Sequence, residues 1–160
     1  MTTLDPRSSH PTLSMADALA ANSADVVVLL GRILMGWIFL RSGYGKIFDI
    51  AAYSTTFPAR GLAPWMAYIA VPVELFGGLA LILGIATRYV AAVLVVFVLV
   101  ASFSSHAYWL MSDANLRRIN DSAFWKNIAM TGGLLFAFVS GPGQLSIDRL
   151  LGGAKRLARQ

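Results

Sequence analysis

Long runs of apolar residues constrain the fold of this chain more than any other feature. Four runs stand out, at Val26 to Lys46, Pro64 to Ala86, Tyr89 to Met111 and Phe124 to Ser140. A helix needs roughly 20 mainly apolar residues to cross the hydrocarbon core of a membrane. The chain is 57% hydrophobic and 13% charged, and 160 residues cannot bury four such runs in one soluble core. We therefore expect an integral membrane protein with four spanning helices.

The links between the runs predict how these helices are arranged. Almost nothing separates the second run from the third, so these two should form an antiparallel hairpin. The link before them is longer and aromatic, and the link after them is polar. The pattern predicts an all-α, integral membrane, antiparallel four-helix bundle with both termini on one side. The dense basic cluster at the C-terminal end favours a cytoplasmic position for both termini.

The chain divides into three parts on this reading. Residues 1–25 are polar and lack the basic and then apolar order of a cleaved secretory signal. Because Ser14 to Asp17 has the S-x-x-D form of a helix start, this part is a tail or a short surface helix. Residues 26–141 form the four-helix transmembrane domain. Residues 142–160 form a basic, amphipathic tail that suits an anionic membrane surface.

Glu74 is the exception within the second run, since it lies at the middle of a predicted membrane helix. An unpaired carboxylate there costs about 3 kcal/mol even on lenient insertion scales, so it needs a partner. Gly77 and Gly78 share its helix face, and small residues let another backbone approach closely. Glu74 should therefore point at a neighbouring helix.

The first run offers that partner. Gly36 and Gly43 lie along roughly the same face as Arg32, which makes a second groove of small residues. If Lys46 lies at the membrane face where the second run begins, Glu74 is roughly 15 Å below that face, Arg32 roughly 20 Å and Arg41 roughly 8 Å. We expect Arg32 to be the first partner of Glu74 and Arg41 the second. A structural ion pair that only fixes helix register is an equal alternative.

Further polar groups gather at the membrane face opposite the termini and predict a cavity with a cationic mouth, aromatic walls and one acid deeper in. Such a site suits a small anionic or quinone-like molecule. A histidine near a helix end is more often a hydrogen-bonding residue, and tryptophans there usually belong to interfacial belts. The expected catalytic residues are Glu74, Arg32 and His106, and the expected ligand-binding residues are Lys46, Arg41, Trp109, Lys126 and Asn127.

Several chemistries are excluded by the residues that are missing. The sequence has no cysteine and therefore no dithiol, thiolate nucleophile or cysteine-bound cluster of its own. With His10 and His106 alone it cannot build a bis-histidine haem site within one bundle or a multi-histidine metal centre. No glycine-rich loop between a strand and a helix offers a nucleotide site. The basic charge flanks the membrane segments and does not indicate nucleic-acid binding.

With these residues laid out, the chain resembles the DoxX family of small bacterial membrane proteins. The resemblance rests on the order and spacing of four segments, "RILMGWIFLRSGYGKIFD" from Arg32, "VELFGGLALILGIATR" from Val73, "SSHAYW" from Ser104 and "FWKNIAMTGGLLFAFVSGPGQLSID" from Phe124. It implies a bacterial inner-membrane protein with both termini cytoplasmic. It also implies a tie to redox physiology, since the family's name comes from a subunit of a thiosulfate:quinone oxidoreductase. The residues that match the family's polar positions are Arg32, Lys46, Glu74, His106, Lys126 and Asn127, and the match does not supply their roles.

Three functions follow as hypotheses. The first is a subunit of a redox system that binds a quinone or similar molecule and takes electrons from a partner protein. In it, Glu74 holds or relays a proton, Arg32 sets its charge, and His106 and Lys126 hydrogen-bond the ligand's oxygens. The second is a non-catalytic scaffold for an oxidoreductase or stress-response complex. The third, a small-solute carrier, would need a continuous polar path through the membrane. The expected partners are the lipid bilayer and either a redox partner protein or a second copy of the chain in a homo-oligomer.

Overall fold

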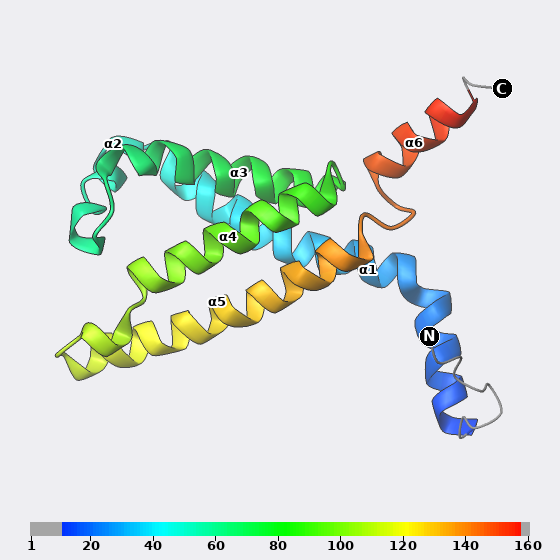
Figure 1. The fold of residues 1–160 in the computed structure, drawn as a ribbon, viewed down its shortest axis with the longest axis horizontal. Helices are drawn as coiled ribbons and strands as arrows, with labels where there is room; N and C mark the ends of the chain where they lie inside the picture. The colour runs from blue at the N-terminus through cyan, green and yellow to red at the C-terminus, as the bar shows by residue number, and fades with distance from the viewer. Residues whose placement is uncertain (1–10, 158–160) are drawn as a thin grey trace, which may run out of the picture.

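The fold is helical throughout the part of the chain that the structure describes. The computed structural model describes residues 11–157, and the side chains of residues 14–152. Its long helices are α1 (Pro11–Ile47), α3 (Ala67–Leu83), α4 (Thr87–Ser105) and α5 (Ala114–Ser140) (Figure 1). The shorter elements are the helices α2 (Ile50–Ser54) and α6 (Ile147–Leu157) and the 3₁₀ helices η2 (Pro58–Arg60), η3 (Pro64–Met66) and η4 (Tyr108–Leu110). The described residues contain no strand, so the predicted all-α class is confirmed.

Three helices in the described chain are long and apolar enough to cross a membrane. They cover Ser14–Ile47, Pro64–Leu83 and Thr87–Leu110. The first contains the first predicted span, and the other two overlap the second and third predicted spans except for their last few residues. The predicted fourth span lies within α5, which is not among them. The first half of α5 carries Arg117, Arg118 and Lys126. The prediction of a membrane protein with spanning helices is confirmed, and the four-helix bundle stays a prediction.

The N-terminal part of α1 projects away from the other helices (Figure 1). The helix begins at Pro11 and runs without a break through Ser14 to Asp17, where the sequence suggested a tail or a separate surface helix. The first ten residues of that predicted tail lie outside the described residues. At the other end of the chain, α6 starts at Ile147 and is likewise set apart in Figure 1.

A tight turn joins α3 to α4 and confirms the predicted antiparallel hairpin. The turn needs positive φ at Gly84 (φ 69°) and at Ala86 (φ 47°), the latter being unusual for a residue with a side chain. Asp148 stabilises it, because its carboxylate accepts hydrogen bonds from the backbone nitrogens of Ala86 (2.8 Å) and Thr87 (3.0 Å). A carboxylate at the start of a helix satisfies free N–H groups and favours the helix dipole. The residues after α5 are thereby attached to the hairpin.

The long helices form two pairs, α1 with α3 and α4 with α5. One buried cluster takes side chains from all four helices: Phe39 from α1, Leu81 from α3, Leu94 and Val98 from α4, and Leu134 from α5. Figure 1 shows the two pairs close together near the α3–α4 turn and diverging towards the end that carries α2 and the α4–α5 connection. The divergence positions the candidate site, which lies between the pairs.

Three glycines bring the backbones of α1 and α3 into contact. A Cβ atom on Gly36 would lie 2.6 Å from the carbonyl oxygen of Gly78, and one on Gly78 would lie 2.6 Å from the carbonyl oxygen of Gly36. A Cβ on Gly43 would lie 2.6 Å from the amide nitrogen of Leu75. These distances leave no room for a side chain, so the helices lie as close as two backbones can. The predicted glycine faces therefore meet, except that Gly77 faces Leu94 of α4.

Gly43→Ala should destabilise the protein, whereas Gly45→Ala should not. The first methyl group would meet the backbone of α3, and such overpacking costs about 1–3 kcal/mol. Gly45 is on the same helix but is exposed, and a Cβ atom added there would have no neighbour within 4 Å. Its replacement should gain about 0.5–1 kcal/mol from helix propensity. Thermal unfolding in detergent compares the two, and equal unfolding temperatures would contradict the backbone contact.

Candidate functional site

An ion pair between the partly exposed Lys46 of α1 and the buried Glu74 of α3 forms the base of the site. The ammonium of Lys46 lies 2.6 Å from Oε2 and 2.9 Å from Oε1 of Glu74, which is 7% exposed. The hydroxyl of Ser42 accepts a hydrogen bond from Lys46 at 2.9 Å and donates one to Glu74 Oε1 at 3.2 Å. Ser42 and Lys46 are four residues apart and therefore share one face of α1. Glu74 therefore has the partner that its position requires, but that partner is Lys46 and not the expected Arg32.

Arg32 does not pair with Glu74, which corrects the expectation from the sequence. Its side chain is 2% exposed and its Nη1 donates to the carbonyl oxygen of Ile82 at 3.4 Å. Its Nη2 donates to the carbonyl oxygen of Leu145. Ile82 lies in the last turn of α3, where carbonyls have no partner within the helix. Arg32 thus joins the end of α3 to the segment before α6.

The register of α1 against α3 explains why Lys46, and not Arg32, contacts Glu74. Gly36 lies level with Gly78 and Ile82, and Gly43 lies level with Leu75, so Glu74 falls between Ser42 and Lys46. The spacing in the sequence predicted that the end of α1 would lie level with Pro64. In the structure Lys46 is instead level with the residues near Pro72, about two helical turns or roughly 12 Å further along α3. That shift removes Arg32 from the reach of Glu74 and brings Lys46 to it.

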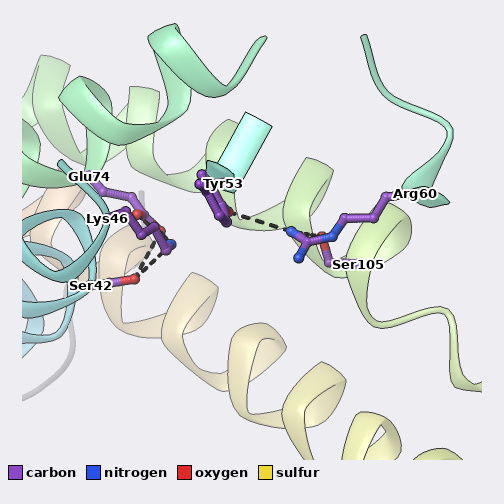
Figure 2. Close-up of polar contacts among 6 residues, drawn as sticks. All are labelled: Ser42, Lys46, Tyr53, Arg60, Glu74 and Ser105. Atoms are coloured by element: carbon purple, nitrogen blue, oxygen red, sulfur yellow. Dashed lines mark hydrogen bonds and ion pairs between the residues drawn. The ribbon is translucent and has the colours of Figure 1, made fainter. Parts of the chain in front are cut away.

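A second group of polar side chains extends the site from Lys46. Tyr53 of α2 lies under the Lys46 ammonium, with 5.0 Å between the nitrogen and the ring centre. On its other side, the Arg60 guanidinium carbon is 5.6 Å from the same ring centre. Arg60 Nη1 lies 3.5 Å from the Tyr53 hydroxyl and 3.4 Å from Ser105 Oγ, distances typical of weak hydrogen bonds. Figure 2 shows Tyr53 between the Ser42–Lys46–Glu74 group and the Arg60–Ser105 contact.

His106 ends α4 and is oriented by α5. Its Nδ1 lies 2.9 Å from Oδ1 of Asn120, whose own Nδ2 donates to the carbonyl oxygen of Leu116 at 2.9 Å. Because the amide oxygen of Asn120 can only accept, Nδ1 of His106 must be the donor. The imidazole therefore keeps Nε2 for another partner.

These groups line a single cavity of about 460 Å³ between the two helix pairs. Its apolar walls include Phe39, Phe97 and Met130. The charged side chains that line it are the paired Lys46 and Glu74, and Arg60. Two cations against one carboxylate leave a net charge of +1 on the lining. A cavity of this size holds a small organic molecule, and its polar groups can orient oxygen atoms on that molecule.

Four of the eight predicted site residues line this cavity, and four do not. Lys46, Glu74, His106 and Asn127 line it. Arg32 and Arg41 are not among the lining residues, Arg41 being exposed. Trp109 is also exposed and packs its ring against Phe103, Tyr108 and Phe124. Lys126 is exposed and lines a neighbouring hollow between α1 and α5, which shares Ile38, Asn127 and Met130 with the cavity. The roles of all eight residues stay predictions.

Sequence reasoning gave no site role to Tyr53, Arg60 and Asn120. The first two lie in the link between α1 and α3, which has enough aromatic residues to suggest an interfacial position but no periodic pattern. A signal was present, since Tyr53 and Arg60 are the polar aromatic and the cation of that link. Asn120 lies in a polar stretch of α5 that resembles an exposed helix face. Its role depends on the contact with His106.

Comparison with known proteins agrees with this helical membrane architecture. The DoxX family model matches residues 27–107, which include the parts of α1, α2, η2, α3 and α4 that line the cavity. The chain belongs to the DoxX family. It is similar to the inner membrane protein YqjF of Escherichia coli (strain K12), with 36% identity over 79% of this chain and 93% of YqjF. It is also similar to the inner membrane protein YphA of the same organism, with 30% identity over 78% of this chain and 89% of YphA.

A third relative matches a smaller part of the chain. It is a Bacillus subtilis (strain 168) protein named "Putative oxidoreductase CatD", with 35% identity over 42% of this chain and 51% of CatD. No solved structure matches the chain significantly. The relatives support an inner-membrane location for this DoxX protein.

Removing one charge of the Lys46–Glu74 pair should lower the free energy of unfolding more than removing both charges. A fully buried ion that loses its partner costs about 3–5 kcal/mol, and an exposed pair contributes about 0–1 kcal/mol. The Lys46 side chain is 26% exposed and that of Glu74 is 9% exposed, so we expect about 1–3 kcal/mol for Glu74→Gln or Lys46→Met. Thermal unfolding of both single variants and of the double variant measures the coupling. Additive losses would show that the two charges do not interact.

Arg32→Lys should lower the unfolding temperature. A lysine has one ammonium group and cannot reproduce the fork by which Arg32 reaches the carbonyls of both Ile82 and Leu145. We expect a loss of about 1–3 kcal/mol, the cost of a buried acceptor left without its donor. Arg118→Lys, at an exposed position of α5, is the matched control and should change nothing. An unchanged unfolding temperature for both variants would contradict the conclusion that Arg32 holds the end of α3 to the segment before α6.

Proposed function

We propose that this DoxX protein is a membrane-embedded subunit of a redox system and binds a quinone or a similar small redox molecule in the cavity beside Glu74. The observation that carries the proposal is the pairing of buried Glu74 with Lys46 at the lining of a cavity of about 460 Å³, which Arg60 and His106 also line. Intramembrane ionisable groups of this kind usually mark functional sites. The name of CatD, a partial relative, adds an oxidoreductase association.

The lining groups suit a ligand with two oxygen atoms. A quinone carries two carbonyl oxygens, and its reduction to a quinol takes two electrons and two protons. Lys46 and Arg60 donate hydrogen bonds to such oxygens. His106 also lines the cavity, and because its Nδ1 is the donor to Asn120, its Nε2 accepts a hydrogen bond from a hydroxyl group of the quinol. Glu74 holds or relays a proton beside them. Hydrogen-bond donors that are already oriented by protein contacts bind a carbonyl oxygen without further reorganisation.

The proposal assigns the supply of electrons to a partner protein in the membrane. The chain has no cysteine, and the sequence has two histidines, His10 and His106. A partner with its own redox centre would deliver both electrons to the bound quinone.

The same proposal includes the membrane topology. In it, α5 is the fourth span and completes an antiparallel four-helix bundle with both termini cytoplasmic. Two observations support this: Leu134 of α5 belongs to the core that all four long helices share, and basic residues are dense after residue 148. The length of α5, 27 residues, is sufficient for a span.

A non-catalytic scaffold is the second candidate function. The observation that favours it is that Ser42 and Lys46 already satisfy the Glu74 carboxylate without any ligand. A pair of this kind fixes the register of two helices. On this reading, variants of Glu74 lower the amount of folded protein and change nothing else.

Purified protein in detergent should bind a benzoquinone, and the double variant Glu74→Gln/His106→Ala should bind it at least about tenfold more weakly. Two lost contacts of about 1 kcal/mol each account for a factor of this size or more. The measurement is isothermal titration of folded, monodisperse protein, which separates binding from protein level. Arg118→Gln is the control at an exposed site. Unaltered binding in the double variant would overturn the site, and loss of protein level alone would favour the scaffold.

A further inference from the structure

A second cavity adjoins the first on the side of the α1–α3 link. It has a volume of about 220 Å³ and lies between that link, α3 and α4. Its walls are almost wholly apolar, and Arg60 is the one charged residue among those that line it. The apolar side chains of this second cavity include Phe57, Leu62, Trp65, Met66, Ile69 and Ala70.

The two cavities share one wall. The residues that line both are Tyr53, Arg60, Phe97, Ala101 and Ser105. Within this wall, the polar contacts are the two weak ones that Arg60 makes, to Tyr53 at 3.5 Å and to Ser105 at 3.4 Å (Figure 2). Among the described residues no carboxylate forms an ion pair with Arg60. Arg60 is held at this wall by these weak contacts and by the rings of Tyr53 and Phe57, whose centres lie 5.6 and 5.8 Å from its guanidinium carbon.

The polarity of the two spaces differs in a way that fits one kind of molecule. The first cavity has the charges of Lys46 and Glu74 and the imidazole of His106, which favour a polar head. The second has hydrocarbon and aromatic walls, which offer a chain nothing to hydrogen-bond and much to pack against. Arg60 lies at the junction, where its guanidinium can stay with the head while its stem lies along the chain.

We infer that the second cavity holds the apolar chain of the ligand whose polar head occupies the first cavity. This inference rests on the proposed function and narrows its ligand to an amphiphilic molecule, a quinone that carries an isoprenoid-type chain. The chain passes the Tyr53–Arg60–Ser105 contact and leaves the head beside Lys46. Because lipid tails are as apolar as this pocket, the chain gains little free energy by leaving the membrane. The second cavity therefore acts by shape, in that it fixes where the chain runs.

The test compares two probes on the wild type and on a variant with a blocked second cavity. The probes are a dimethoxy-methyl-benzoquinone without a chain and the same ring with a short isoprenoid chain. Ala70→Phe fills the second cavity and leaves the first untouched, since residue 70 lines only the second. We expect Ala70→Phe to weaken binding of the chain-bearing probe about tenfold or more and that of the chainless probe less than about twofold. Isothermal titration in one detergent keeps the partitioning of each probe the same for all proteins.

Two further variants keep the result interpretable. Ala92→Phe adds the same bulk at an exposed position of α4 outside both cavities and should leave both probes unaffected. Ser104→Leu blocks the second cavity from α4 and replaces Ala70→Phe if that variant does not fold. Equal effects on the two probes, or no effect on either, would overturn the inference and leave the proposed function standing. Failure of both probes to bind the wild type would overturn the two together.

Discussion

The backbone contact between α1 and α3 is the constraint on which the rest of the structure depends. Gly36, Gly43 and Gly78 leave no space for a side chain, so the two helices can meet in one register only. In a membrane, where lipid and leucine are equally apolar, such close packing is a main source of specificity between helices. The register decides which polar groups face each other across the contact. A side chain at any of these glycines would separate the helices and, with them, the charges.

Arg32, which is buried, and Lys46, which is partly exposed, receive different roles from this one register. Lys46 meets Glu74 and Ser42, so its charge is neutralised beside a cavity that a ligand can enter. Arg32 meets backbone carbonyls at the end of α3 and before α6, where its fork of donors replaces missing helix bonds. A flexible single ammonium suits a site that exchanges partners, and a rigid fork suits a permanent junction. The chemical difference between lysine and arginine thus matches the two locations.

The sequence predicted the parts of this structure that depend on local pattern. Apolar length gave the three spanning helices, and the spacing of Gly36, Gly43 and Gly78 gave the faces that meet. The partner of Glu74 depends instead on an offset of roughly 12 Å between the ends of α1 and α3, which no periodicity records. Tyr53 and Arg60 were missed for the same kind of reason, because the link that carries them folds back over the site and has no repeating pattern.

Arg60 gives the lining of the site its net positive charge. Lys46 and Glu74 offset each other, so the remaining positive charge of the cavity lining is that of Arg60, which contacts neutral hydroxyl groups. A buried or half-buried cation attracts oxygen lone pairs, and a ligand oxygen supplies them at lower cost than water confined between apolar walls. Since Arg60 lines both cavities, that attraction acts at the point where a polar head would join an apolar chain. The position of a cation that no carboxylate of the described residues pairs with therefore favours an amphiphile over a compact polar solute.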